Sequence, residues 1–169
     1  MFAIPNPLHP AIVHFPIVLI LLGTALALVA VILRRWHLPW AAAVLLAAGA
    51  LGAFAATRTG SQQAEMVGEI SERAEAVLDQ HEEWGEMTRN LAIAAAILAL
   101  ASASLIRFSR TARGLGIVTA MVAVAAAYAV AQTGHYGGQL VYKHGIGINL
   151  AAGNNPVSAD TIPAKIGGD

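Results

Sequence analysis

Cysteine is absent from the 169 residues of this chain. Its absence excludes disulfides, thiolate metal ligands, iron–sulfur clusters and the covalent CxxCH attachment of c-type haem. Charge is also scarce, since 12% of the residues are charged while 57% are hydrophobic. An ordinary soluble domain carries about 25% charged residues. The composition therefore predicts a membrane protein.

Four apolar runs contain no Asp, Glu, Lys or Arg, and a bilayer-spanning helix needs about 20 such residues. They are Ala11–Leu33, Pro39–Ala56, Leu91–Ile106 and Gly114–Thr133. We expect the third span to borrow a turn and to cover 88–106. The prediction is an all-α membrane protein with a four-transmembrane-helix domain over 1–148, followed by a loop or disordered tail over 149–169. Residues 1–10 carry no Lys or Arg, so the first run is interpreted as a retained helix, not a signal peptide. No internal repeat is strong enough to use.

Acidic residues are missing from both short connections between the spans. Arg34 and Arg35 lie in the first, and Arg107, Arg110 and Arg113 lie in the second. Short loops rich in Lys and Arg stay in the cytoplasm. We therefore expect a multi-pass protein of the bacterial inner membrane with both termini on the periplasmic side.

The long segment between the second and third spans is amphipathic. One apolar stripe at helical spacing contains Val67, Ile70, Ala74, Val77, Leu78, His81 and Trp84, and a second stripe is acidic. We predict an amphipathic helix over 61–87 on the outer face of the bundle. Its acidic face points to water and is also suited to docking a basic partner.

Five of the six histidines are predicted to share the outer end of this bundle, while His37 lies at the opposite end. They are His9, His14, His81, His135 and His144. Imidazole suits iron, copper or zinc at neutral pH. His14 enters a membrane span, where a titratable group is costly. Glycines beside His135 let a bulky planar group approach the backbone. The alternative for His81, which lies on the apolar stripe, is a core histidine bonded to a backbone carbonyl.

Two anchor strings together resemble a bacterial membrane-protein family, the domain-of-unknown-function 2231 family, over about Leu8 to Gly147. The strings are His9-Pro10…Val13-His14-Phe15-Pro16 and Gly134-His135…Gly137-Gly138…Leu140-Val141-Tyr142…His144-Gly145. His81 falls where the middle histidine of that family is expected. The resemblance implies a four-helix protein that binds haem b in an electron-transfer setting with c-type cytochromes. It leaves the axial pairing open.

The leading functional hypothesis is a membrane b-type cytochrome that binds one or two haem b groups by histidine pairs near the periplasmic face. It would relay electrons between a membrane donor and a periplasmic c-type cytochrome, either alone or as a subunit of a larger redox complex. His14, His135 and His81 are the first-choice axial ligands, ahead of His144 and His9. Cations at the same interface that suit haem propionates are Arg58, Arg89 and Lys143.

Two alternatives remain open: a His-rich copper- or zinc-binding membrane protein, and a structural subunit of a respiratory or photosynthetic complex. A transporter is disfavoured because the spans lack the polar residues that such proteins place at mid-membrane. No nucleophile–base pair or carboxylate dyad supports an independent enzyme. The expected partners are lipid, c-type cytochrome or other redox subunits, and a quinone as an open option, with no nucleic acid.

Overall fold

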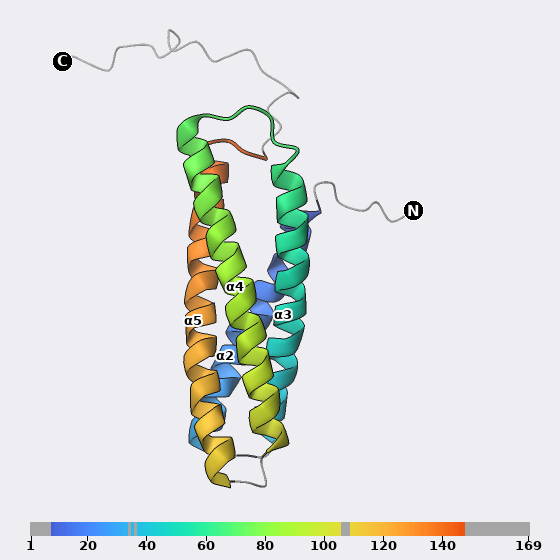
Figure 1. Ribbon diagram of the computed structural model, residues 1–169, viewed down its shortest axis with the longest axis vertical. Coiled ribbons are helices and arrows are strands. Elements are labelled where there is room, and N and C mark those ends of the chain that lie inside the picture. Colours follow the sequence, from blue (N-terminus) through green and yellow to red (C-terminus); the bar gives the residue numbers. More distant parts are fainter. Residues whose placement is uncertain (1–7, 34, 36, 106–108, 148–169) are drawn as a thin grey trace, which may run out of the picture.

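Four long helices run alternately up and down in the computed structural model of the chain (Figure 1). The structure describes residues 8–33, 35, 37–105 and 109–147. Its helices are α1 (His9–Ile12), α2 (His14–Leu33), α3 (His37–Ala64), α4 (Glu72–Ser104) and α5 (Ser109–Tyr142). Within the described residues, four helical segments are long and apolar enough to cross a membrane, with α1 and α2 counted as one. The predicted all-α, four-span fold class is confirmed. The tail predicted for 149–169 lies outside the described residues.

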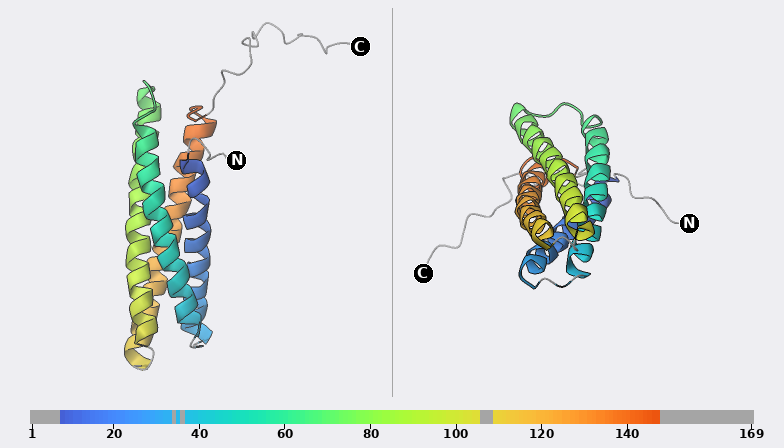
Figure 2. Two further views of the ribbon diagram at one scale, coloured as in Figure 1. Left: turned by 90° about the vertical axis from the view of Figure 1, so that its right-hand side faces the viewer. Right: turned by 60° about the horizontal axis from the view of Figure 1, so that its bottom comes forward.

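The bundle has two chemically different ends. Figure 2 shows that α1 and the last turns of α5 lie at the same end, beside the connection from α3 to α4. We call this the histidine end, because it holds His9 and His81. The opposite end carries the α2–α3 and α4–α5 connections with Arg35, Arg110 and Arg113, and we call it the arginine end.

The first span is interrupted near its start. Val13 separates α1 from α2, and Pro16 follows three residues later. Proline has no N–H, so the carbonyl four residues before it, that of Ile12, loses its helical donor. The sequence therefore predicts that the helical hydrogen bonding is interrupted here. The structure shows this interruption as the helix break at Val13. The break leaves His9 on its own short turn, separate from the long helix.

The amphipathic segment is not the single helix predicted for 61–87. Residues 61–64 belong to the end of α3, a turn at Glu65 and Met66 and an irregular stretch that includes Gly68 follow, and the remainder is the first half of α4. The Ser71 hydroxyl accepts a hydrogen bond from the amide of Ala74 and caps α4. Glycine disfavours helix and a serine cap starts one, so the helical pattern divides at this point. The acidic residues from Glu72 to Glu86 therefore lie on the first half of α4, while Glu65 and Glu69 lie in the connection before it.

Small side chains dominate the interior. Ile20 and Leu46 are the largest fully buried side chains, and most of the other buried residues are alanines. A Cβ added at Gly49 would lie 2.9 Å from Cγ1 of Ile20, so α2 and α3 pack closely only because this residue is glycine. Many Leu, Ile and Val side chains point outward instead. This arrangement suits lipid, where close van der Waals packing holds helices together.

The two helical hairpins, α1/α2 with α3 and α4 with α5, bury equivalent positions. Every buried residue of α2 has a buried counterpart in α4 that stands 72 positions later, as Thr88 does after Pro16. The pairs are Pro16/Thr88, Ile20/Ala92, Gly23/Ala95, Thr24/Ala96 and Ala27/Ala99. Five buried residues of α3 recur 77 positions later in α5: Ala42/Thr119, Ala43/Ala120, Leu46/Ala123, Gly49/Ala126 and Ala53/Val130. The chain therefore contains an internal structural repeat that its sequence does not reveal.

The arrangement of the helices agrees with this repeat. Each hairpin packs internally, and the hairpins meet where α3 contacts α4 and where α2 contacts α5. A twofold rotation about the long axis of the bundle would exchange α2 with α4 and α3 with α5. The two interfaces between hairpins differ, because α2 and α5 make fewer contacts than α3 and α4. The symmetry is therefore approximate, and we refer to this line as the pseudo-twofold axis.

Candidate functional site

His9 is held against α3 by a backbone hydrogen bond. Its Nδ1 lies 2.9 Å from the carbonyl oxygen of Ala56 and 3.3 Å from Oγ1 of Thr59. The ring packs directly over Gly60, where an added Cβ would lie 3.0 Å from Cε1 of the histidine. A carbonyl oxygen only accepts hydrogen bonds, so Nδ1 of His9 must carry the proton.

His81 is held against α5 in the same way. Its Nδ1 lies 2.9 Å from the carbonyl oxygen of Thr133, and a Cβ added at Gly137 would lie 3.0 Å from its Cε1. Thr133 is itself anchored, because its hydroxyl donates to the carbonyl of Ala129 and lies 3.1 Å from the hydroxyl of Thr88. The same tautomer follows for His81, with the proton on Nδ1.

The two histidines occupy equivalent positions in the repeat. His81 stands 72 positions after His9, the same interval that relates the buried residues of α4 to those of α2. Thr133 stands 77 positions after Ala56, and Gly137 stands 77 after Gly60. In each hairpin, one histidine from the first half therefore packs against the second helix. Its Nδ1 meets a backbone carbonyl there, and its ring lies over the glycine four residues after that carbonyl.

The two rings face each other across the pseudo-twofold axis. Their centroids are 6.3 Å apart and their planes are nearly perpendicular, at 87°. Both residues are partly buried. Among the described residues neither Nε2 has a hydrogen-bond partner, so one ring nitrogen of each histidine is not engaged by the protein. A histidine ligand commonly donates its other ring N–H to a backbone carbonyl in this way.

The other candidate histidines are not brought to this pair. His14 is exposed on α2, beside an apolar hollow formed with Phe15, Val18 and Leu19 of the same helix. His135 is exposed on α5, where its Nε2 accepts from the amide of Gln139 at 2.8 Å and its ring contacts Tyr136.

Two further histidines lie at the ends of helices. His144 is partly buried in the turn after α5, which ends at Gly145 with a φ of 67°. His37 is exposed at the arginine end, as predicted.

The three predicted propionate cations all have neighbours of their own. Arg58 stacks on the ring of Phe54 at 5.7 Å from its centroid. Arg89 pairs with Glu86 at 3.5 Å, the one ion pair among the described residues. Lys143 donates to the side chain of Gln139 at 2.9 Å. Each keeps donors beyond these contacts that could meet an anionic partner.

Sequence reasoning ranked His9 last, and it missed the residues that position the pair. Nothing in the sequence marks Ala56, Thr59 or Gly60 as site residues. Ala56, for example, contacts His9 only through its backbone oxygen. The one usable signal was Gly137, which the sequence analysis included among the glycines near His135. Its contact is with His81 instead. Within the described residues, no group of three or more His, Cys, Asp or Glu side chains could hold a metal ion. The described residues therefore bring two imidazole side chains together at this site.

Comparisons with known proteins give one positive result. A family model described as "predicted membrane protein" and named for domain of unknown function 2231 matches residues 5–150. No curated protein matches, and no solved structure matches. The resemblance of the two anchor strings is thereby confirmed. The matched region includes both histidines of the pair and both glycines beneath them, and the chain belongs to the domain-of-unknown-function 2231 family of predicted membrane proteins.

Proposed function

We propose that this protein is a membrane b-type cytochrome in which His9 and His81 are the axial ligands of one haem b. The observation that carries the proposal is the spacing of the two rings. Imidazoles that bind one metal from opposite sides, each with a metal–nitrogen distance of about 2 Å, have centroids roughly 6.5 Å apart. The measured separation of 6.3 Å matches this value.

The protonation of the two rings supports the same assignment. Each Nδ1–H is bonded to a backbone carbonyl, so in the tautomer that this bond selects the lone pair of Nε2 is the one that would bind the metal. Gly60 and Gly137 leave the space that a Cβ would occupy, which lets both rings lie close to their helices. The residues of the site therefore fit a group that needs two neutral imidazoles.

Haem is favoured over a bare copper or zinc ion because haem iron needs fewer ligands from the protein. A protein zinc site uses three or four protein side chains. The porphyrin supplies four nitrogens of its own, so haem iron needs only two more. The described residues bring two histidines together and no third ligand.

The role we propose is electron transfer. Haem supplies a one-electron couple when bound, and imidazoles at both axial positions leave no open place for oxygen chemistry. The histidine end would face the periplasm, because the Arg-rich connections belong in the cytoplasm. Its acidic side chains on α4 are exposed: Glu72, Glu75, Asp79, Glu82, Glu83 and Glu86. They suit the docking of a basic c-type cytochrome, which would accept electrons that come from a membrane donor such as quinol.

Absorption spectra of the purified protein test this proposal. The wild type, expressed with haem supplied, is expected to show a b-type reduced spectrum and one haem per chain in a pyridine haemochrome assay. His9→Ala and His81→Ala should each lose that haem, whereas His14→Ala and His135→Ala should keep it. A colourless wild type that contains copper or zinc would replace the proposal by the metal-ion alternative. Loss of haem only in the second pair of variants would show that a different histidine pair binds it.

A further inference from the structure

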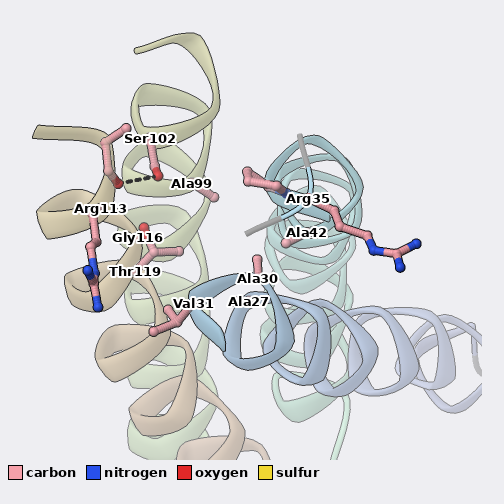
Figure 3. Close-up of a pocket in the computed structure, with 12 residues that line it drawn as sticks. Ala27, Ala30, Val31, Arg35, Ala42, Ala99, Ser102, Arg113, Gly116 and Thr119 are labelled. Carbon is pink, nitrogen blue, oxygen red and sulfur yellow. Dashed lines mark hydrogen bonds between the residues drawn. The ribbon is translucent and has the colours of Figure 1, made fainter. Parts of the chain in front are cut away.

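We propose that a cavity at the arginine end binds one anionic phospholipid, with the phosphate at the rim and the apolar part of the lipid inside. The cavity has a volume of about 200 Å³ and lies between the two hairpins (Figure 3). All four long helices contribute to its wall. This inference is independent of the haem proposal, which concerns the other end of the bundle.

The cavity lies on the pseudo-twofold axis. Its wall contains residues that the internal repeat pairs at intervals of 72 or 77 positions. The pairs are Ala27/Ala99, Ala30/Ser102, Pro39/Gly116 and Ala42/Thr119. Both members of each pair are small or compact, so the hairpins leave a space between them where larger side chains would close it. The cavity therefore follows from the repeat and is not an isolated packing defect.

The interior of the cavity suits hydrocarbon. Its two hydroxyl groups are already bonded within their own hairpin, since Ser102 donates to the carbonyl of Ala112 at 2.9 Å and Thr119 to that of Leu115 at 2.8 Å. The other lining residues present mainly alanine methyl groups. A polar solute would find few unsatisfied partners here, whereas the glycerol and first acyl carbons of a lipid would fill the space without cost to hydrogen bonding.

The rim of the cavity carries unbalanced positive charge. Arg35 and Arg113 both line it, and Figure 3 shows their guanidinium groups extending away from its interior. Among the described residues neither has a carboxylate partner. No Asp or Glu occurs anywhere in residues 1–64 or 87–159. A counter-ion must therefore come from outside these parts of the chain.

An anionic phospholipid matches both parts of the site. Basic pockets between membrane helices on the cytoplasmic side bind acidic lipid head groups, and each arginine near the membrane surface contributes about a fivefold gain in affinity. Figure 3 shows the guanidinium groups of Arg35 and Arg113 on different sides of the cavity, so a soluble anion such as phosphate would pair with one of them at a time and would leave the apolar interior unfilled. The joint presence of the cavity and the two cations favours the lipid.

Native mass spectrometry of the full chain, released from nanodiscs that contain phosphatidylcholine and phosphatidylglycerol, tests the proposal. The wild type should retain one phosphatidylglycerol and exclude phosphatidylcholine. Arg113→Gln should retain roughly fivefold less. Arg110→Gln is the matched control, because it removes the same charge from the same helix at an exposed residue that does not line the cavity. Equal losses in the two variants would overturn the proposal, since they would mean diffuse attraction to the surface.

A second variant separates the cavity from the charge. Gly116→Leu is expected to fill the space, because a Cβ there meets only Oγ of Ser102, at an ordinary 3.4 Å. Circular dichroism and gel filtration should show a folded variant, and the phosphatidylglycerol adduct should disappear although both arginines remain. An unchanged adduct would overturn the role of the cavity. Thermal protection by inorganic phosphate alone, equal to that by phosphatidylglycerol, would identify a soluble anion as the ligand instead.

Discussion

The ring of His9 stands nearly perpendicular to the ring of His81, with 6.3 Å between their centroids, although 72 positions separate the two residues in the chain. Each is bonded through Nδ1 to a carbonyl on the second helix of its own hairpin. Neither hairpin contains the pair by itself. The site therefore forms only when the two hairpins pack together, and its geometry depends on the contacts that hold each ring and each interface.

Gly137→Ala should displace His81. The new Cβ would lie 3.0 Å from Cε1 of the ring and 3.2 Å from its Nδ1, so the ring must move by a few tenths of an ångström away from residue 137, which disturbs its hydrogen bond to Thr133. Disturbing such an outer contact of a ligand typically weakens metal binding by about tenfold or more. We expect a comparable loss of haem affinity in a titration of the haem-free protein.

The neighbouring substitution Gly138→Ala is the control, because nothing lies within 4 Å of a Cβ at that position. Nitrogen NMR of the histidine ring gives a readout that does not need the cofactor. The Nδ1-protonated signal of His81 should change in Gly137→Ala and stay in Gly138→Ala. Identical spectra for both variants would contradict the contact on which this prediction depends.

Gly49→Ala should destabilise the bundle. Its Cβ would lie 2.9 Å from Cγ1 of Ile20 and 3.2 Å from the Ile20 backbone nitrogen, so α2 must move away from α3. Overpacking of this kind costs about 1–3 kcal/mol in free energy of unfolding. The quantity can be measured by denaturant titration in mixed micelles.

Gly114→Ala is also a glycine-to-alanine substitution, but it is expected to raise the free energy of unfolding. Gly114 lies in α5 with nothing within 4 Å of an added Cβ, and alanine is favoured over glycine in a helix by about 0.8–1 kcal/mol. A modest rise in stability is expected. If both glycine variants fell in stability by the same amount, close packing at Gly49 would not be the cause.

Thr24→Val should weaken the contact between the hairpins. The buried Thr24 hydroxyl lies 2.7 Å from the carbonyl of Ile20 and 3.1 Å from the carbonyl of Ala123 on α5. Valine keeps the shape and removes the single donor proton that the two carbonyls share, at a cost of about 0.6–1.7 kcal/mol inside a membrane protein. Thr57→Val, which loses only a local bond to Phe54, should change the free energy of unfolding far less. A larger effect at Thr57 would contradict the assigned role of Thr24.

Ser71→Ala should loosen the start of α4. The serine hydroxyl accepts from the amide of Ala74 at 3.3 Å, and loss of such a cap costs about 1 kcal/mol. Hydrogen exchange should therefore speed up over the first turns of α4, while the buried part near Ala92 and Ala95 keeps its protection. Ser61→Ala, at a residue that bonds to the carbonyl of Thr57 within α3, is the control and should leave α4 unchanged.

The division of the amphipathic segment shows where local patterns are reliable. The apolar spacing around His81 predicts helix, and α4 is helical there. The interruption between Ala64 and Ser71 was missed because the apolar stripe continues through Val67 and Ile70 on either side of Gly68. Periodicity alone does not include the energy of a cap or the cost of a glycine in a helix.

The ranking of the histidines as haem ligands stays a prediction, but the structure shows a pairing that the sequence does not reveal. His14 and His135 ranked highest because of their immediate neighbours, a membrane span and flanking glycines. The structure leaves both exposed, and it places His9 opposite His81. That juxtaposition depends on which carbonyl each ring meets. Neighbours along the chain contain no information about residues that lie 47 or 52 positions away.

Composition and hydrophobic run length by themselves determined the membrane class, the four spans and the concentration of arginine at one end, because these properties depend on each segment alone. The break near Pro16 was also visible, since a missing N–H acts locally. Only the tertiary structure decided the pairing of His9 with His81, the equivalence of the two hairpins and the cavity between them. The repeat is hidden in the sequence because its paired positions share burial and register, not residue identity or size, as Pro16 with Thr88 and Leu46 with Ala123 show. Close packing of two helices depends on the shape of their surfaces, and many different small residues produce the same shape.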